Sequence, residues 1–188
     1  MSGSQENAVE ELGRFRSYLR FLARVQLDRR LQAKVDPSDI VQQSLLQAHQ
    51  AREQFRGATD AERAAWLRQI LSRTLAHALR DFQREKRDVA REVSLSQAMD
   101  ASSARLERWL QADQSHPDQR AERNERMLLV SDALERLPPD QRDAIILRYW
   151  QGLPLQDIGD ELHRSPRAIA GLLQRGLKTL RTSLKPFE

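Results

Sequence analysis

The sequence predicts an all-α protein built as two small helical domains joined by a flexible linker. Apolar residues recur at intervals of three and four along most of the chain, which is the period of a helix with one buried face. No alternation of apolar and polar residues continues long enough to indicate a β-strand. The 188 residues suffice for one ordinary domain or for two small ones and a linker.

Two helices are expected at the start of the chain. The first is expected because six apolar residues lie along one helical face: Val9, Leu12, Phe15, Leu19, Leu22 and Val25. It should end near Arg30. The second should begin after Asp36 and run to about Gln54, since aspartate is a good N-cap and proline suits the first helical position. Opposite its core residues this helix carries a polar face, called here the amide face, which consists of Asp39, Gln42, Gln43, Leu46 and His49.

A polar break that contains a glycine, residues 55–60, precedes a long third helix expected from about Ala61 to Asp88. One side of this helix is apolar from Trp66 to Phe82. The other side carries basic residues at intervals of four, three, four and three. They form a basic stripe that consists of Arg73, His77, Arg80, Arg84 and Arg87. Such a stripe suits a nucleic acid, and it also suits a solvated helix face.

The expected domain boundaries follow from composition. Residues 8–93 form the first domain, which ends shortly after the long helix. Residues 94–121 are rich in serine, glutamine, aspartate and alanine and keep no apolar period, so they are expected to form the linker. A helical pattern returns in residues 122–188, the second domain, with a break at Pro138 and Pro139.

The second domain ends in a pattern typical of a helix-turn-helix. A short helix is expected from about Leu155 to Leu162, followed by a turn and a longer helix with Ser165 as its N-cap and Pro166 at its first position. From Arg164 to Phe187 there are six basic residues and no acidic one. The outer side of the second helix, called here the DNA face, consists of Arg164, Arg167, Gly171, Gln174, Arg175, Lys178 and Arg181.

This DNA face suits the major groove, because it is basic and offers a glycine where a backbone could approach closely. The first turns of the helix are expected to contact base edges, whereas Arg175 and Lys178 are expected to contact phosphates. The alternative is an ordinary helical hairpin with a solvated basic face. A helix-turn-helix by itself does not indicate which kind of regulator carries it.

The composition argues against several other classes of protein. The chain has no cysteine, which excludes disulfides and thiolate metal sites, and its four histidines lack the spacing of metal ligands. No grouping of serine, histidine and carboxylate suggests a catalytic triad, so neither catalytic residues nor a cofactor is expected. No apolar run is long enough to span a bilayer, and the first residues lack the pattern of an export signal. A cytoplasmic protein without membrane insertion is therefore expected.

Two parts of the chain resemble conserved domains of the sigma-70 family of bacterial RNA polymerase sigma factors. Residues 36–48, 55–57 and 66–70, with the sequences DPSDIVQQSLLQA, FRG and WLRQI, are similar to the second domain of that family. Residues 134–142, LERLPPDQR, together with the helix-turn-helix, are similar to its fourth domain. The two parts occur in the family's order, cover about 155 residues and lack the third domain, as in the extracytoplasmic-function group.

The resemblance implies a function and a role for each surface. The function is to bind core RNA polymerase and direct promoter-specific initiation in response to a stress or envelope signal. The amide face would dock on the clamp helices of the polymerase, whose flap is a second contact. Phe55 and Arg56 would capture a flipped base of the minus-10 element. Four residues of the basic stripe would follow that element: Arg73, His77, Arg80 and Arg84. The DNA face would bind the minus-35 element, and an anti-sigma factor is a further implied partner.

Two other classes of function stay open from the sequence. A free-standing helix-turn-helix regulator would use its front half to sense a signal or to dimerise, and it would bind duplex DNA without polymerase. A nucleic-acid-modifying enzyme is the least favoured class, because no acid, base, nucleophile or metal set is apparent. Among single residues, Phe55 could simply pack its own loop.

Overall fold

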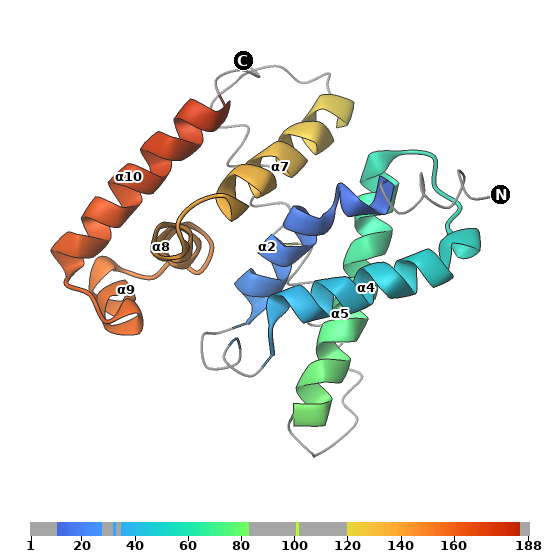
Figure 1. Ribbon diagram of the computed structural model, residues 1–188, viewed down its shortest axis with the longest axis horizontal. Coiled ribbons are helices and arrows are strands. Elements are labelled where there is room, and N and C mark those ends of the chain that lie inside the picture. Colours follow the sequence, from blue (N-terminus) through green and yellow to red (C-terminus); the bar gives the residue numbers. More distant parts are fainter. Residues whose placement is uncertain (1–10, 28–31, 33–34, 83–100, 102–119, 185–188) are drawn as a thin grey trace. The chain divides into compact units, whose positions relative to one another are not determined.

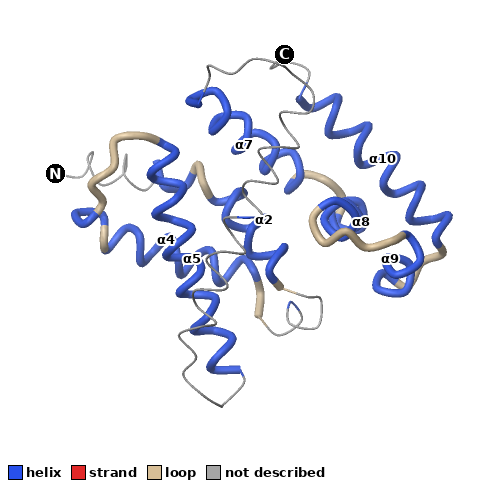
Figure 2. The backbone as a smooth tube through the Cα atoms, turned by 180° about the vertical axis from the view of Figure 1, so that it is seen from behind, coloured by secondary structure: helices blue, strands red, loops and turns tan. Residues whose placement is uncertain are grey.

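Figure 1 shows the computed structural model of the chain, which describes residues 11–27, 32, 35–82, 101 and 120–184. These residues form helices joined by turns and loops, with no strand among them (Figure 2). The predicted all-α fold class is therefore confirmed. The chain divides into two compact units, Met1–Leu128 and Leu129–Glu188.

The two units meet within a helix. The division falls inside helix α7 (Arg120–Glu135), so that the first half of α7 belongs to one unit and the second half to the other. Most of the predicted linker, residues 94–121, lies outside the described residues. The boundaries at 93 and 121 therefore stay a prediction.

Besides the first half of α7, the described part of the first unit contains three helices and one short turn of 3₁₀ helix: α2 (Arg16–Gln26), α4 (Pro37–Gln50), η1 (Arg52–Gln54) and α5 (Asp60–Phe82). All three α-helices pack on one another, and both views show α4 lying across α5 (Figures 1 and 2). Their shared core is fully buried and consists of Tyr18, Leu19, Leu22, Val41, Ala48, Leu67, Leu71 and Leu75. The packing of α4 on α5 leaves the opposite side of α4 in solvent.

The helix ends differ from the sequence prediction in two places. Helix α2 ends at Gln26 rather than near Arg30. Its buried side includes Tyr18 and Phe21, whereas Val25, which was expected on that side, is only half-buried. Helix α4 ends at Gln50, and η1 takes up the residues to Gln54 that were expected to continue it. Its start is as predicted, since the Ser38 amide donates to Oδ1 of Asp36 at 2.7 Å.

The second unit contains α8 (Pro139–Tyr149), α9 (Leu155–Leu162) and α10 (Pro166–Leu184), and these three helices contact one another. Figure 1 shows α8 nearly end-on beside α10, with α9 at one end of α10. Helices α8 and α10 meet closely at Gly176, because a Cβ atom there would lie only 2.8 Å from Cδ1 of Ile145. The buried residues of this unit include Ala144, Ile145, Ile158, Ile169 and Leu180.

The turn between α9 and α10 has the predicted helix-turn-helix form. His163 ends α9 in the left-handed conformation, with φ of 54°, and the Arg164 amide donates to the Gly159 carbonyl at 2.8 Å. The Ala168 amide donates to Oγ of Ser165 at 3.2 Å, which confirms Ser165 as the N-cap. The first helical residue of α10 is Pro166, also as predicted.

Gly159 generates the first testable prediction. A Cβ atom on Gly159 would lie 2.6 Å from the carbonyl oxygen of Arg164, a backbone atom that cannot swing aside. Although alanine is intrinsically the better helix residue, Gly159→Ala should lower the free energy of unfolding by about 1 to 3 kcal/mol through this overlap. Urea unfolding followed by the helical circular dichroism signal measures the change.

Gly13→Ala is the matched control, because a Cβ atom at Gly13 would have nothing within 4 Å. It should change the free energy of unfolding by no more than about 0.5 kcal/mol. If the two variants unfold alike, the turn does not depend on the missing side chain of Gly159.

Candidate nucleic-acid interface

The second unit carries the predicted DNA face along α10. Six of its seven residues lie on this helix, and the seventh, Arg164, lies in the turn just before it. Five of the six are exposed: Arg167, Gln174, Arg175, Lys178 and Arg181. Helix α10 contains no acidic residue, so all the charged side chains on its outer side are basic, while Ile169, Leu173 and Leu180 are buried on the inner side. The arrangement gathers cations along one helix, which is the charge distribution that binding to a polyanion requires.

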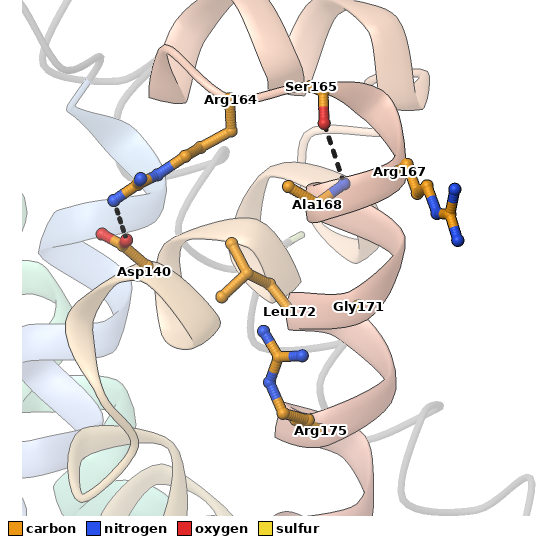
Figure 3. Close-up of a pocket in the computed structure, with 8 residues that line it drawn as sticks. All are labelled: Asp140, Arg164, Ser165, Arg167, Ala168, Gly171, Leu172 and Arg175. Carbon is orange, nitrogen blue, oxygen red and sulfur yellow. Dashed lines mark hydrogen bonds and ion pairs between the residues drawn. The ribbon is translucent and has the colours of Figure 1, made fainter.

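A groove with a volume of about 520 Å³ opens at the start of α10 (Figure 3). It is lined by Asp140, Arg164, Ser165, Arg167, Ala168, Gly171, Leu172 and Arg175. The figure shows Arg164 reaching toward Asp140 on α8, Arg175 extending toward Leu172, and Arg167 directed away from both. The groove therefore combines cationic side chains from α10 and its turn with a single carboxylate from α8.

Asp140 is a component of this surface that the sequence did not single out. Its carboxylate pairs with Nη2 of Arg164 at 3.0 Å, although the two residues are 24 positions apart. Both side chains are about half exposed, 55% for Arg164 and 52% for Asp140, so the pair contributes little to stability. The residues around Asp140 in the sequence do not indicate that this residue, in the first turn of α8, would lie next to the turn between α9 and α10.

The amide face lies on the solvent side of α4. Asp39, Gln42, Gln43 and Leu46 are exposed, and Leu46 stands out because 56% of this large apolar side chain is accessible. His49 is half-buried, and its Nδ1 finds no hydrogen-bond partner within the described part of the chain. The five residues follow one another at helical spacing, so the structure brings them together on one side of α4.

Phe55 packs into its own loop. Its ring centroid lies 5.1 Å from that of Trp66 on α5, and the guanidinium carbon of Arg63 lies 5.4 Å from the Phe55 centroid. Gly57 folds over the same ring, since a Cβ atom there would come within 2.5 Å of Cζ of Phe55. The ring is half-buried and Arg56 beside it is exposed. A base that stacks on Phe55 would meet a ring already held on one side by protein.

A capping box closes this loop at the start of α5. Oε2 of Glu62 accepts from the Ala58 amide at 2.9 Å, from the Thr59 amide at 3.0 Å and from the Thr59 hydroxyl at 2.9 Å. In return the Glu62 amide donates to Oγ1 of Thr59 at 3.2 Å. These donors, with the Ala58 amide first, hold the pKa of Glu62 below its ordinary value. The Thr-x-x-Glu signature was present in the sequence and identifies this cap.

The predicted basic stripe is described only in part. Arg73 and His77 are exposed on α5, one turn apart and on the same side. Arg80 lies on the same helix, and Arg84 and Arg87 lie outside the described residues. The structure therefore shows the beginning of the stripe.

No metal or membrane site emerges from the described residues. No group of three or more histidine or acidic side chains among them could hold a metal ion. None of the described helices is both long enough and apolar enough to cross a membrane.

Comparison with known proteins finds three similarities. The family model of sigma-70 region 4 matches residues 127–180, which run from the last turns of α7 through most of α10. The ECF RNA polymerase sigma factor SigX of Bacillus subtilis (strain 168) is 25% identical over 152 residues, which cover 81% of this chain and 72% of SigX. The sigma factor RpoE of Bartonella quintana, solved in complex with the anti-sigma factor NepR, is 22% identical. Its alignment covers 94% of this chain and 95% of that one, with a TM-score of 0.35.

The capping box leads to a prediction about pH. Because the pKa of Glu62 is lowered in the folded chain, its carboxylate stabilises the fold above the unfolded-state pKa. This contribution is lost as the pH falls through the lower, folded-state value. Glu62→Ala should therefore lower the thermal midpoint at neutral pH, and the gap to wild type should narrow as the pH falls well below 4.5.

Thermal unfolding by circular dichroism at a series of pH values measures that gap. Glu53→Ala, which removes an exposed carboxylate from the neighbouring η1 turn, is the control and should leave the midpoint unchanged at neutral pH. A gap between wild type and Glu62→Ala that stays constant down to acidic pH would contradict the assigned cap.

Proposed function

We propose that this chain, which belongs to the extracytoplasmic-function group of the sigma-70 family, acts as a sigma factor that binds core RNA polymerase and directs it to promoters. The observation that carries the proposal is the exposed, acid-free side of α10 within a helix-turn-helix that the sigma-70 region 4 family matches. The alignment with SigX extends beyond this unit to 81% of the chain, which supports one function for both units.

We assign minus-35 recognition to the DNA face. The recognition helix of a helix-turn-helix enters the major groove with its first turns at the base edges and its later residues near the backbone. Lys178 and Arg181 are exposed in the later turns of α10, where they would contact phosphates. Arg164 can exchange Asp140 for a DNA phosphate at low cost, since their pair is half exposed.

We assign core polymerase binding to the amide face. A helix that presents an exposed leucine among amides suits a helix-on-helix interface, because the leucine supplies apolar contact area and the amides supply hydrogen bonds. The clamp helices of the polymerase are the proposed partner of this face, and its flap is the proposed partner of the second unit.

We assign minus-10 recognition to the first unit. Arg73, His77 and Arg80 on α5, continued by Arg84, would follow the DNA, and Arg56 would contact a phosphate next to a base captured at Phe55. Sigma factors are non-enzymatic regulators, and we propose that this chain has no catalytic activity or cofactor. We further propose that it works in the cytoplasm and that an anti-sigma factor restrains it until a stress or envelope signal arrives. Membership of the group supports these last points.

Core binding by the amide face is the first test. Full-length chain carrying Gln42→Ala and Gln43→Ala should lose most of its capture of core polymerase subunits in a pull-down, while its helical circular dichroism stays unchanged. Both side chains are exposed, so their removal should cost the fold about 0.5 kcal/mol or less. The matched control is Gln69→Ala, an exposed glutamine on α5 that lies outside the amide face.

Two results would count against this assignment. If wild-type chain captures no core polymerase, the proposed function fails and a free-standing regulator becomes the better interpretation. If the double variant binds core polymerase as wild type does, the amide face is not the docking surface.

Promoter opening at Phe55 is the second test. Phe55→Leu keeps an apolar side chain against Trp66 but removes the aromatic ring, so the loop should stay folded while base stacking is lost. Stacking is worth about 1 to 3 kcal/mol per base, and open-complex formation should fall by a corresponding factor. Permanganate footprinting on a promoter recovered from transcribed genomic fragments measures the effect, with core association as the control. Normal opening by Phe55→Leu would mean that Phe55 only packs its loop.

A further inference from the structure

The guanidinium of Arg175 lies over Gly171, one helical turn nearer the start of α10. A Cβ atom built on Gly171 would come within 3.2 Å of Nη1 of Arg175 and 3.8 Å of its Cζ and Nη2. Residues four apart share a helix face, and side chains lean toward the N-terminal end of their helix. The Arg175 side chain therefore occupies space that a side chain at position 171 would otherwise take.

This placement moves a positive charge from the third turn of α10 toward its second. In Figure 3 the Arg175 guanidinium points along the helix toward Leu172, inside the groove, whereas Arg167 is directed outward. Arg164 reaches the same groove from the turn but is paired with Asp140 at 3.0 Å. Arg175 is thus the arginine of the groove that lies closest to Gly171.

We infer that Gly171 is a positioning residue, which lets Arg175 recognise a guanine in the major groove from the level of the first two turns of α10. The inference rests on the proposed function. It adds the group that Arg175 binds, a guanine base, and the residue that positions the Arg175 side chain, Gly171. Arginine pairs with O6 and N7 of guanine through two parallel hydrogen bonds, the commonest specific contact of this kind. From its spacing in the sequence, Arg175 is grouped with Lys178 as a phosphate contact. The position of its guanidinium over Gly171 favours a contact with a base edge instead.

The groove distinguishes Arg175 from Lys178, the other basic residue that spacing groups with it. Asp140 lines the same groove, and it pairs with Arg164 at its edge. Lys178, further along α10, does not line the groove and keeps the phosphate role.

The test begins with the sequence preference of the full-length chain, alone and with core polymerase. Duplexes with about ten randomised base pairs, one helical turn, are selected by binding and sequenced. Wild type should enrich a site that contains a guanine, and Arg175→Ala should lose that preference at one base pair with little change in salt dependence. Lys178→Ala should do the opposite: its preference stays, and the slope of log affinity against log salt falls by about 0.9.

Gly171→Ala then tests the positioning. Alanine is the better helix residue, so this variant should melt no lower than wild type. Its Cβ atom requires Nη1 of Arg175 to shift by only a few tenths of an ångström, so its discrimination for the guanine should fall only slightly. Gly171→Leu, which fills the space, should remove the preference as fully as Arg175→Ala does. In the Arg175→Ala background, Gly171→Ala should have no further effect. Ser183→Ala, which improves helix propensity at an exposed position away from the groove, is the control and should keep the preference.

The contradicting outcomes are separate. If wild type selects no preferred duplex under either condition, the proposed function fails together with this inference. If wild type selects a site and Arg175→Ala selects the same site with a lower salt slope, Arg175 contacts a phosphate and the inference is wrong. If Gly171→Ala weakens binding equally with and without Arg175, residue 171 contacts DNA directly and does not act through Arg175.

Discussion

One backbone contact determines how the second unit presents α10 to its surroundings. The carbonyl of Arg164 occupies the place where a Cβ atom of residue 159 would lie, and the amide of Arg164 bonds back to the carbonyl of Gly159. The missing side chain of Gly159 and the Arg164–Gly159 hydrogen bond together place the turn directly against α9. Together with the close approach of α8 and α10 at Gly176, they bury Ile169, Leu173 and Leu180. The basic residues of α10 lie on the side of the helix away from these buried residues and are exposed.

The two proposed interaction surfaces differ in the physical origin of their affinity. The charged side chains on the outer side of α10 are all cationic, so its proposed binding to DNA would depend on counterion release and respond to salt. The amide face has one carboxylate, two amides, an exposed leucine and a half-buried histidine, so its proposed binding to polymerase would depend mainly on contact area and hydrogen bonds. A protein that must join a large enzyme and then search DNA benefits from this separation, because salt changes that loosen the second contact leave the first largely intact.

Local patterns in the sequence predicted the helices, the helix-turn-helix and the caps at Asp36 and Ser165, because each depends on residues within one or two turns. The exposure of the amide face also follows from periodicity. The ion pair of Asp140 with Arg164 could not be predicted, since it joins residues that only the packing of α8 brings together. The same holds for Phe55 against Trp66 and Arg63, where a loop aromatic meets a helix of the same unit. The position of Arg175 over Gly171 has the right spacing in the sequence, but spacing does not show which way a long side chain turns.

The clean division between the two sides of α10 has an evolutionary consequence. Folding of the second unit depends on the inner residues, whereas Arg167, Gln174 and Lys178 are exposed and contribute little to stability. Substitutions at these outer positions can accumulate after gene duplication without a loss of the folded state. A duplicated copy could therefore drift toward a different set of target genes while it keeps the same scaffold, and cells that need many parallel responses would gain them from one architecture.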